Sequence, residues 1–196
     1  MKQLVFIHGG EVFDTYDAYL NALRTWQYEF FQEGEKRWKD SLAEELGSEW
    51  EVHMPSMPSP YNAKYIEWSI WFERIIPHLR DGVVLVGHSL GGIFLAKYLS
   101  EHKLPVTIRS TILIAAPATE ASGPLADFVL PPSLTLLEQQ GGAIVLYHST
   151  DDDVVPYADL SIYTAQLPKA EVRTFSDRGH FLTPEFPEFI QNIKAL

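Results

Sequence analysis

The sequence predicts an α/β fold, a three-layer α/β/α sandwich in which a mostly parallel six-stranded sheet lies between two layers of helices. Short apolar runs rich in Val, Ile and Leu recur along the chain, and helix-like segments separate them. Most of these runs do not alternate apolar with polar residues, which is typical of strands buried on both faces. Strands that alternate with helices form parallel sheets covered on both sides. The 196 residues suit a single domain, residues 1–196.

The expected strands are six apolar runs, and several of them end at a glycine or a proline. The second run stops at the proline-rich stretch PSMPSP, and the fourth ends at Pro117. The runs are Gln3–His8, Trp50–Met54, Gly82–Gly87, Ser110–Pro117, Ala143–His148 and Ala170–Phe175.

Helix-like segments lie between these strands and after the last one. In the first segment Trp38, Leu42 and Leu46 recur every four residues, and Gly47 marks the end of the helix. The second segment is strongly apolar, and Pro77 is expected to end or bend it. The expected helices are Glu35–Leu46, Ala63–Leu79, Gly91–His102, Tyr157–Leu167 and Pro184–Leu196.

Composition excludes several classes of function. The net charge is −11, and an acidic surface repels phosphate backbones and anionic lipids, so neither a nucleic acid nor a membrane surface is expected as a partner. The chain has no cysteine, which excludes disulfides, cysteine nucleophiles and thiolate metal sites.

The start of the chain carries no visible targeting segment. The first residues, MKQLVFIHGG, run directly into an expected strand, so no signal peptide is visible. No apolar run reaches the roughly 20 residues of a membrane span. We therefore expect a cytoplasmic protein.

Reactive side chains follow four of the six expected strands at the point where each strand ends. The first strand leads to His8–Gly10, the third to Ser89, the fifth to Asp151–Asp153 and the sixth to His180. Because ligands bind at the carboxyl ends of the strands in open parallel sheets, we expect these residues to form one site.

Ser89 lies in the pattern Gly87-His88-Ser89-Leu90-Gly91, between an apolar strand and a helix-like segment. This Gly-x-Ser-x-Gly pattern is typical of a sharp turn that exposes a nucleophilic serine, with a helix N-terminus behind it that favours negative charge. The other interpretation is a tight strand-to-helix turn that carries a solvated serine.

A nucleophilic serine needs a base, and the base needs an acid that orients it. His180 stands in a loop after the last strand, and Gly179 before it gives the backbone freedom to turn the imidazole inward. Asp151–Asp153 follow the fifth strand. We take Asp152 as the acid, with Asp151 and Asp153 as alternatives.

Acyl transfer also needs donors for the oxyanion. We expect these from the N–H of Leu90, which follows the serine, and from the N–H of Gly10 in the loop after the first strand. His8 and His88 are expected to be structural residues near the site. No histidine pair has metal-ligand spacing with a third donor close by, so no metal and no cofactor are predicted.

With these motifs the chain resembles the α/β-hydrolase family over its whole length, and in particular the small retinoblastoma-binding-protein-like serine hydrolases. The stretches that carry the resemblance are VFIHGG, LVGHSLGG, HSTDDDVVP and DRGHF, and the order serine, aspartate, histidine is that of α/β-hydrolases. The resemblance implies that the acid lies four residues before Pro156, which is Asp152. It also implies the strand order 2-1-3-4-5-6.

Two segments depart from many relatives. Ala118–Gln140, after the fourth strand, is too short for a large cap domain, so a minimal fold without such a cap is expected. The long segment Glu11–Glu49, which carries the aromatic stretch Arg24–Trp38, is expected to lean over the site instead.

The predicted function is a serine hydrolase, a carboxylesterase on small or short-acyl esters, with amides as the less favoured substrates. Ser89 would attack the acyl carbon, His180 would move the proton and Asp152 would orient His180. The expected pocket residues flank these loops: Glu11, Phe13, His88, Leu125, Phe128, Tyr157 and Phe181.

Two alternatives stand beside this hypothesis. The chain could be a catalytically weak protein that uses the same fold for protein or ligand binding, since a fold does not determine a function. It could also be an acyl transferase or perhydrolase, which differs only in the acceptor. The sequence does not indicate the oligomeric state or the natural substrate.

Overall fold

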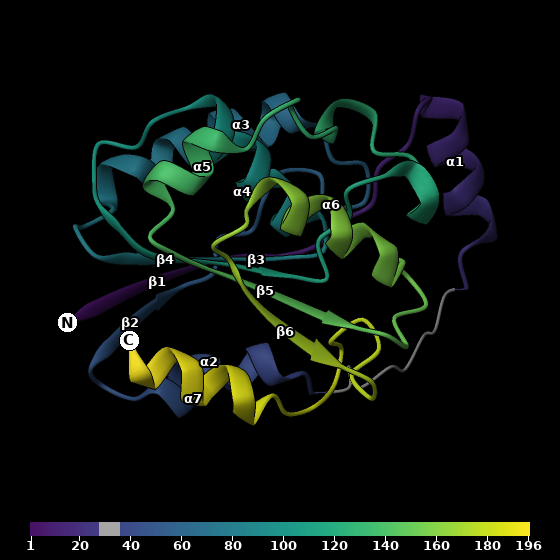
Figure 1. The fold of residues 1–196 in the computed structure, drawn as a ribbon. Helices are drawn as coiled ribbons and strands as arrows, with labels where there is room; N and C mark the ends of the chain where they lie inside the picture. Colours follow the sequence, from purple (N-terminus) through teal and green to yellow (C-terminus); the bar gives the residue numbers. More distant parts are fainter. Residues whose placement is uncertain (28–35) are drawn as a thin grey trace.

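In the computed structural model, which describes residues 1–27 and 36–196 (of Ser122, the backbone only), six parallel strands form one sheet (Figure 1). Their order is β2-β1-β3-β4-β5-β6, which confirms the order that the sequence implied. The strands are β1 (Lys2–Ile7), β2 (Trp50–His53), β3 (Val83–His88), β4 (Ile108–Ile114), β5 (Ala143–Ser149) and β6 (Glu171–Phe175).

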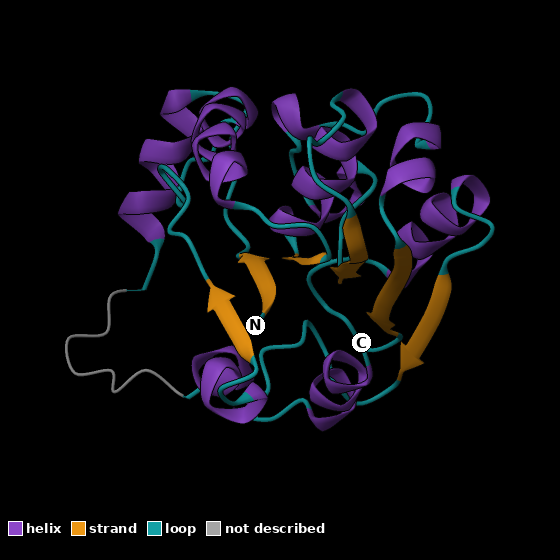
Figure 2. Cartoon of the chain, turned by 90° about the vertical axis from the view of Figure 1, so that its left-hand side faces the viewer, coloured by secondary structure: helices purple, strands orange, loops and turns teal. Residues whose placement is uncertain are grey.

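Helices cover both faces of the sheet, as the three-layer arrangement requires (Figure 2). Helices α3 to α6 pack on one face, and α2 and α7 pack on the other. The α-helices of the described residues are α1 (Tyr16–Thr25), α2 (Leu42–Leu46), α3 (Tyr65–Ile75), α4 (Leu90–Glu101), α5 (Thr135–Gln140), α6 (Leu160–Gln166) and α7 (Pro187–Ala195).

Alternate residues of the central strands supply two separate cores. In β1, Leu4 and Phe6 face the core under α2 and α7, whereas Val5 and Ile7 face the core under α3 to α6. All four side chains are fully buried. Burial on both faces is what the continuous apolar runs predicted, because successive residues of a strand point to opposite faces.

The last strand differs from this prediction in its burial. β6 is an edge strand that pairs only with β5, and Val172 is 42% exposed. The position of the strand was predicted correctly, but a strand with one neighbour and little cover is not buried on both faces.

The segment predicted as the helix Glu35–Leu46 consists of two shorter pieces. Glu35 lies outside the described residues, and the rest forms the 3-10 turn η1 (Trp38–Ser41) followed by α2. The second predicted helix ends as expected, because α3 passes at Ile75 into the 3-10 turn η2 (Ile76–His78), which contains Pro77.

Helices α1 and α5 were not predicted. α1 buries none of its residues, although Tyr16, Tyr19, Leu20 and Leu23 recur at the spacing of one helix face, a pattern that was overlooked in the sequence. Its start also carries a signal, because the Thr15 hydroxyl caps the helix by accepting a hydrogen bond from the N–H of Ala18 at 3.1 Å.

Between β4 and β5 the chain forms only short turns and α5, and no cap domain is evident in the part of the chain that the structure describes. Within residues 1–27 and 36–196, no helix has the length and apolar character that a membrane span requires.

Candidate active site

Ser89 occupies a sharp turn between β3 and α4. Its backbone has φ 55° and ψ −124°, a conformation that residues other than glycine rarely adopt. Its N–H donates to the carbonyl of Ile114 at 2.8 Å. A Cβ on Gly91 would collide with the carbonyl oxygen of Ile7, and one on Gly87 would collide with the backbone of Gly91. Gly91 therefore lets α4 approach β1 closely, and Gly87 lets the end of β3 approach the start of α4.

The residues expected to form an oxyanion hole lie around this turn. Leu90 is the first residue of α4, so its N–H has no acceptor within the helix. A Cβ added to Gly10 would come within 2.8 Å of the Pro60 carbonyl, and one added to Gly9 would come within 3.1 Å of the Ser89 Cβ. The loop after β1 therefore passes directly beside the serine.

Asp152 contacts His180. The Nδ1 atom of His180 lies 2.9 Å from Oδ2 and 3.1 Å from Oδ1 of Asp152. Oδ1 also accepts hydrogen bonds from the N–H groups of Val154 and Val155, both at 2.9 Å. Burial alone raises the pKa of Asp152, but the imidazole and the two N–H groups outweigh it and hold the pKa below its usual value. Asp152 is therefore a carboxylate at neutral pH.

The neighbouring aspartates have other surroundings. Asp151 accepts a hydrogen bond from the N–H of Gly179 at 3.0 Å and one from the Ser149 hydroxyl, so it holds the loop that precedes His180. Asp153 is exposed, and its side chain makes no hydrogen bond with any residue that the structure describes. Of the three, only Asp152 lies against the imidazole.

His8 and His88 are held by backbone hydrogen bonds, as the sequence led us to expect. His88 Nε2–H donates to the carbonyl of His180 at 2.8 Å. Burial lowers the pKa of His88 to about 3, with a further contribution from His180, so the ring is neutral. The Nε2 atom of His8 accepts from the N–H of Met57 at 2.9 Å.

A third histidine near the site, His148, was not predicted from the sequence. His148, near the end of β5, is buried, and its Nε2–H donates to the carbonyl of Val155 at 3.0 Å. The same nitrogen lies 3.8 Å from Oδ2 of Asp152. The signal was its place in the strand that leads to the aspartates, four residues before Asp152.

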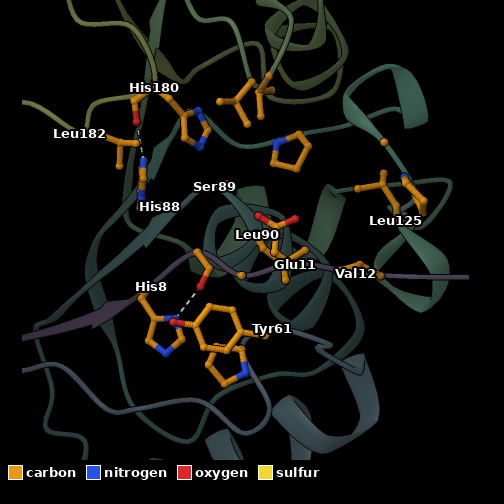
Figure 3. A pocket seen from close by; sticks show the side chains of 18 of the residues that line it. His8, Glu11, Val12, Tyr61, His88, Ser89, Leu90, Leu125, His180 and Leu182 are labelled. Carbon is orange, nitrogen blue, oxygen red and sulfur yellow. Dashed lines mark hydrogen bonds between the residues drawn. The ribbon is translucent and has the colours of Figure 1, made fainter. Parts of the chain in front are cut away.

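Ser89 and His180 line the same pocket, whose volume is about 620 Å³ (Figure 3). Among the described residues, no hydrogen bond joins the Ser89 hydroxyl to His180. Such bonds are often long in ligand-free sites and tighten when substrate binds. The other lining residues are His8, Gly9, Gly10, Glu11, Val12, Arg37, Lys39, Pro60, Tyr61, His88, Leu90, Pro117, Gly123, Pro124, Leu125, Val154, Val155 and Leu182.

Three of the expected pocket residues, Glu11, His88 and Leu125, line this pocket. In Glu11, burial raises the pKa, while the nearby His180 lowers it by a smaller amount. Arg37 and Lys39 were not predicted as lining residues, although both belong to the long segment expected near the site.

The prediction was wrong for Phe128 and Phe181, which are core residues and not pocket residues. Phe128 is fully buried and packs edge-on against Trp68. Phe181 is 1% exposed and packs on Phe175 and Phe186. Both lie in chain segments next to the site, but their side chains turn away from it into the two cores.

Phe13 and Tyr157 also lie outside the pocket lining. Phe13 packs against Tyr19 and Trp26 of the α1 region, with ring centroids 5.5 and 6.1 Å away. The hydroxyl of Tyr157 shares a hydrogen bond of 2.9 Å with Thr174 on β6. The partners Tyr19, Trp26 and Thr174 are likewise not among the described residues that line the pocket.

No group of three or more His, Asp or Glu side chains within the described ranges is arranged to hold a metal ion. Around Ser89 the pocket brings together a hydroxyl, an imidazole paired with a carboxylate, and backbone N–H donors.

A family model described as "Serine hydrolase" matches residues 29–186. The chain belongs to the serine hydrolase family. It is 26% identical to "Serine hydrolase RBBP9" of Rattus norvegicus over 141 residues, which cover 72% of this chain and 75% of that protein.

Solved structures show the same fold. The ydeN gene product of B. subtilis superposes with a TM-score of 0.76 at 18% identity, covering 100% of this chain and 98% of that one. A putative yden-like hydrolase of Pectobacterium atrosepticum gives a TM-score of 0.67 at 14% identity, covering 99% and 90%. The fold is therefore that of the α/β-hydrolases, as the resemblance implied.

Proposed function

We propose that this serine hydrolase is a carboxylesterase that acts on small or short-acyl esters through Ser89, His180 and Asp152. The observation that carries the proposal is the pairing of His180 with a buried carboxylate at 2.9 Å, in the pocket that also exposes Ser89. A hydroxyl, an imidazole and a carboxylate in this relation are the components of nucleophilic acyl transfer.

In the first half of the proposed reaction, Ser89 Oγ attacks the acyl carbon and His180 Nε2 takes the hydroxyl proton. Asp152 holds Nδ1–H and stabilises the imidazolium that forms. The carbonyl oxygen becomes an oxyanion, to which the N–H groups of Leu90 and Gly10 donate. Collapse of this intermediate expels the alcohol, to which His180 returns the proton, and leaves Ser89 acylated.

In the second half a water molecule replaces the alcohol. His180 takes a proton from the water, and the resulting hydroxide attacks the acyl carbon. The second tetrahedral intermediate uses the same two N–H donors. Its collapse releases the carboxylic acid and returns the proton to Ser89 Oγ, so the enzyme is regenerated unchanged.

The size of the pocket supports small substrates. Its volume of about 620 Å³ is shared between the acyl group and the leaving group. Apolar side chains such as Val12, Leu125 and Leu182 line it, together with several charged and polar groups. A long acyl chain would extend beyond this lining, where burial no longer stabilises it.

A panel of 4-nitrophenyl esters with acyl chains of two to twelve carbons tests the proposal, with a matched anilide for amide activity. We expect kcat/KM to be highest for the short chains, to fall for the long ones, and to be lost in Ser89→Ala. Activity that persists in Ser89→Ala, or that rises steadily with chain length, contradicts the proposal.

A further inference from the structure

The 3-10 turn that starts at Trp38 presents two basic side chains to the pocket. Trp38 is 1% exposed, and its neighbours Arg37 and Lys39 both line the cavity. The N–H of Trp38 donates to the carbonyl of Thr183 at 3.0 Å, and its indole N–H donates to the carbonyl of Phe181 at 2.9 Å. Because both acceptors belong to the loop that follows His180, the turn is fixed beside the proposed base.

Arg37 and Lys39 are two cations, one on each side of Trp38, in a chain whose net charge is −11. Neither side chain forms an ion pair with any residue in the described ranges. The carboxylate of Asp40 accepts the backbone N–H of Arg37 at 2.9 Å, so it is occupied in holding the turn. Two positive groups that line a cavity, with no ion-pair partner in the part of the chain that the structure describes, are suited to a ligand of opposite charge.

The charge of Lys39 affects titratable groups of the pocket lining. Burial lowers the pKa of Lys39 and repulsion from Arg37 lowers it further, while the carboxylate of Asp40 raises it by a smaller amount. Lys39 also contributes to the lowered pKa values of His8 and His88, both of which line the cavity. Its charge therefore acts on two histidines of the pocket lining.

We propose that Arg37 and Lys39 bind an anionic group of the substrate, so that the preferred esters carry a carboxylate. This inference rests on the proposed esterase function and adds a substrate class to it. The anion occupies the side of the pocket next to the His180 loop, and Glu11 is the one acidic side chain among the lining residues that the structure describes. With two cations and one carboxylate, the lining attracts an anion and keeps it away from Glu11.

Two matched pairs of esters test the proposal. The first pair is 3-carboxyphenyl acetate and 3-acetylphenyl acetate, which differ in the charge of the leaving group. The second is monophenyl succinate and phenyl 4-oxopentanoate, which differ in the charge of the acyl group. The measured quantity is the ratio of kcat/KM for the charged ester to that for the neutral one, so differences in active fraction cancel.

We expect the ratio to exceed one in at least one pair, and that pair shows which side of the ester carries the carboxylate. Arg37→Gln and Lys39→Gln should each lower the ratio about tenfold, the size of one lost hydrogen bond to a charged group. Glu11→Gln should raise it, and 0.5 M NaCl should lower it because salt screens the attraction. Lys36→Gln is the matched control: Lys36 is exposed, lines a different hollow, and should leave the ratio unchanged.

A binding measurement separates this proposal from the esterase function. Ser89→Ala protein is titrated with the esters of both pairs in a calorimeter, alone and combined with Lys39→Gln. In at least one pair, tighter binding of the carboxylate ester that Lys39→Gln abolishes supports the anion site even if no ester is hydrolysed. Equal binding within both pairs, or a charged-to-neutral ratio that Arg37→Gln and Lys39→Gln leave unchanged, overturns it while esterase activity on neutral substrates stands.

Discussion

Replacing Asp152 by asparagine changes one atom of the site. In the wild type, Oδ1 accepts the N–H groups of Val154 and Val155 at 2.9 Å, and Oδ2 is the oxygen nearest to His180 Nδ1, also at 2.9 Å. An asparagine keeps both backbone bonds only if its oxygen takes the place of Oδ1. Its NH₂ group then faces Nδ1, which must accept, so the imidazole proton moves to Nε2.

A histidine protonated at Nε2 cannot take the proton of Ser89, and the negative charge that stabilises the imidazolium is lost as well. For a base held in the wrong tautomer the expected loss in kcat is about 10⁴-fold, which corresponds to about 5.4 kcal/mol of activation free energy. KM should change little, because Asp152 is not among the lining residues of the pocket that the structure describes.

The assay is hydrolysis of 4-nitrophenyl acetate by wild type, Asp152→Asn, Asp151→Asn and the control Asp153→Asn. Asp153 is exposed, so its variant should keep kcat within about twofold, as surface substitutions away from special features usually do. Full turnover in Asp152→Asn, together with loss in Asp151→Asn or Asp153→Asn, refutes the assignment of the acid.

Two further predictions concern the turn and its surroundings. Gly91→Ala should destabilise the protein by about 2–4 kcal/mol, because the added Cβ collides with the carbonyl of Ile7 and neither backbone can move freely. A melting temperature within about 2 °C of wild type, a shift that corresponds to roughly 1 kcal/mol or less in a chain of this size, contradicts this. The second prediction is a pH dependence from His88, whose pKa is lowered to about 3 in the fold and is about 6.5 in the unfolded chain. Between these values only the unfolded chain binds the proton, so stability falls as the pH falls, by about 2 kcal/mol between pH 7 and pH 5. Urea denaturation at both pH values should show this loss in wild type and a smaller one in His88→Gln, and equal losses contradict it.

The sheet could be predicted from sequence because its strands have a strong local signal. The central runs, such as Gly82–Gly87, are apolar throughout since both of their faces are buried. The turn at Ser89 was also recognisable, because the close approach of α4 to β1 excludes a side chain at Gly91. Each of these features depends on neighbours in the chain or on a single tight contact.

The pocket lining could be predicted only in part, because it depends on the direction of side chains in irregular segments. Phe128 and Phe181 lie in segments next to the site yet turn into the core, and no period of the sequence indicates this. Arg37 and Lys39 reach the pocket because Trp38 between them is buried. The sequence shows a basic residue on each side of this tryptophan. That the two basic residues reach the pocket depends on the hydrogen bonds from Trp38 to the loop after His180, which join distant parts of the chain.

The most direct test of the central claim is covalent labelling of Ser89. A fluorophosphonate probe reacts with a serine only when a base activates it and an oxyanion site accepts the developing charge. We expect one label per chain, located on Ser89 by peptide mass spectrometry, absent in Ser89→Ala and strongly slowed in Asp152→Asn. A folded wild-type protein whose Ser89 does not react would contradict the account and favour a binding role for the same fold.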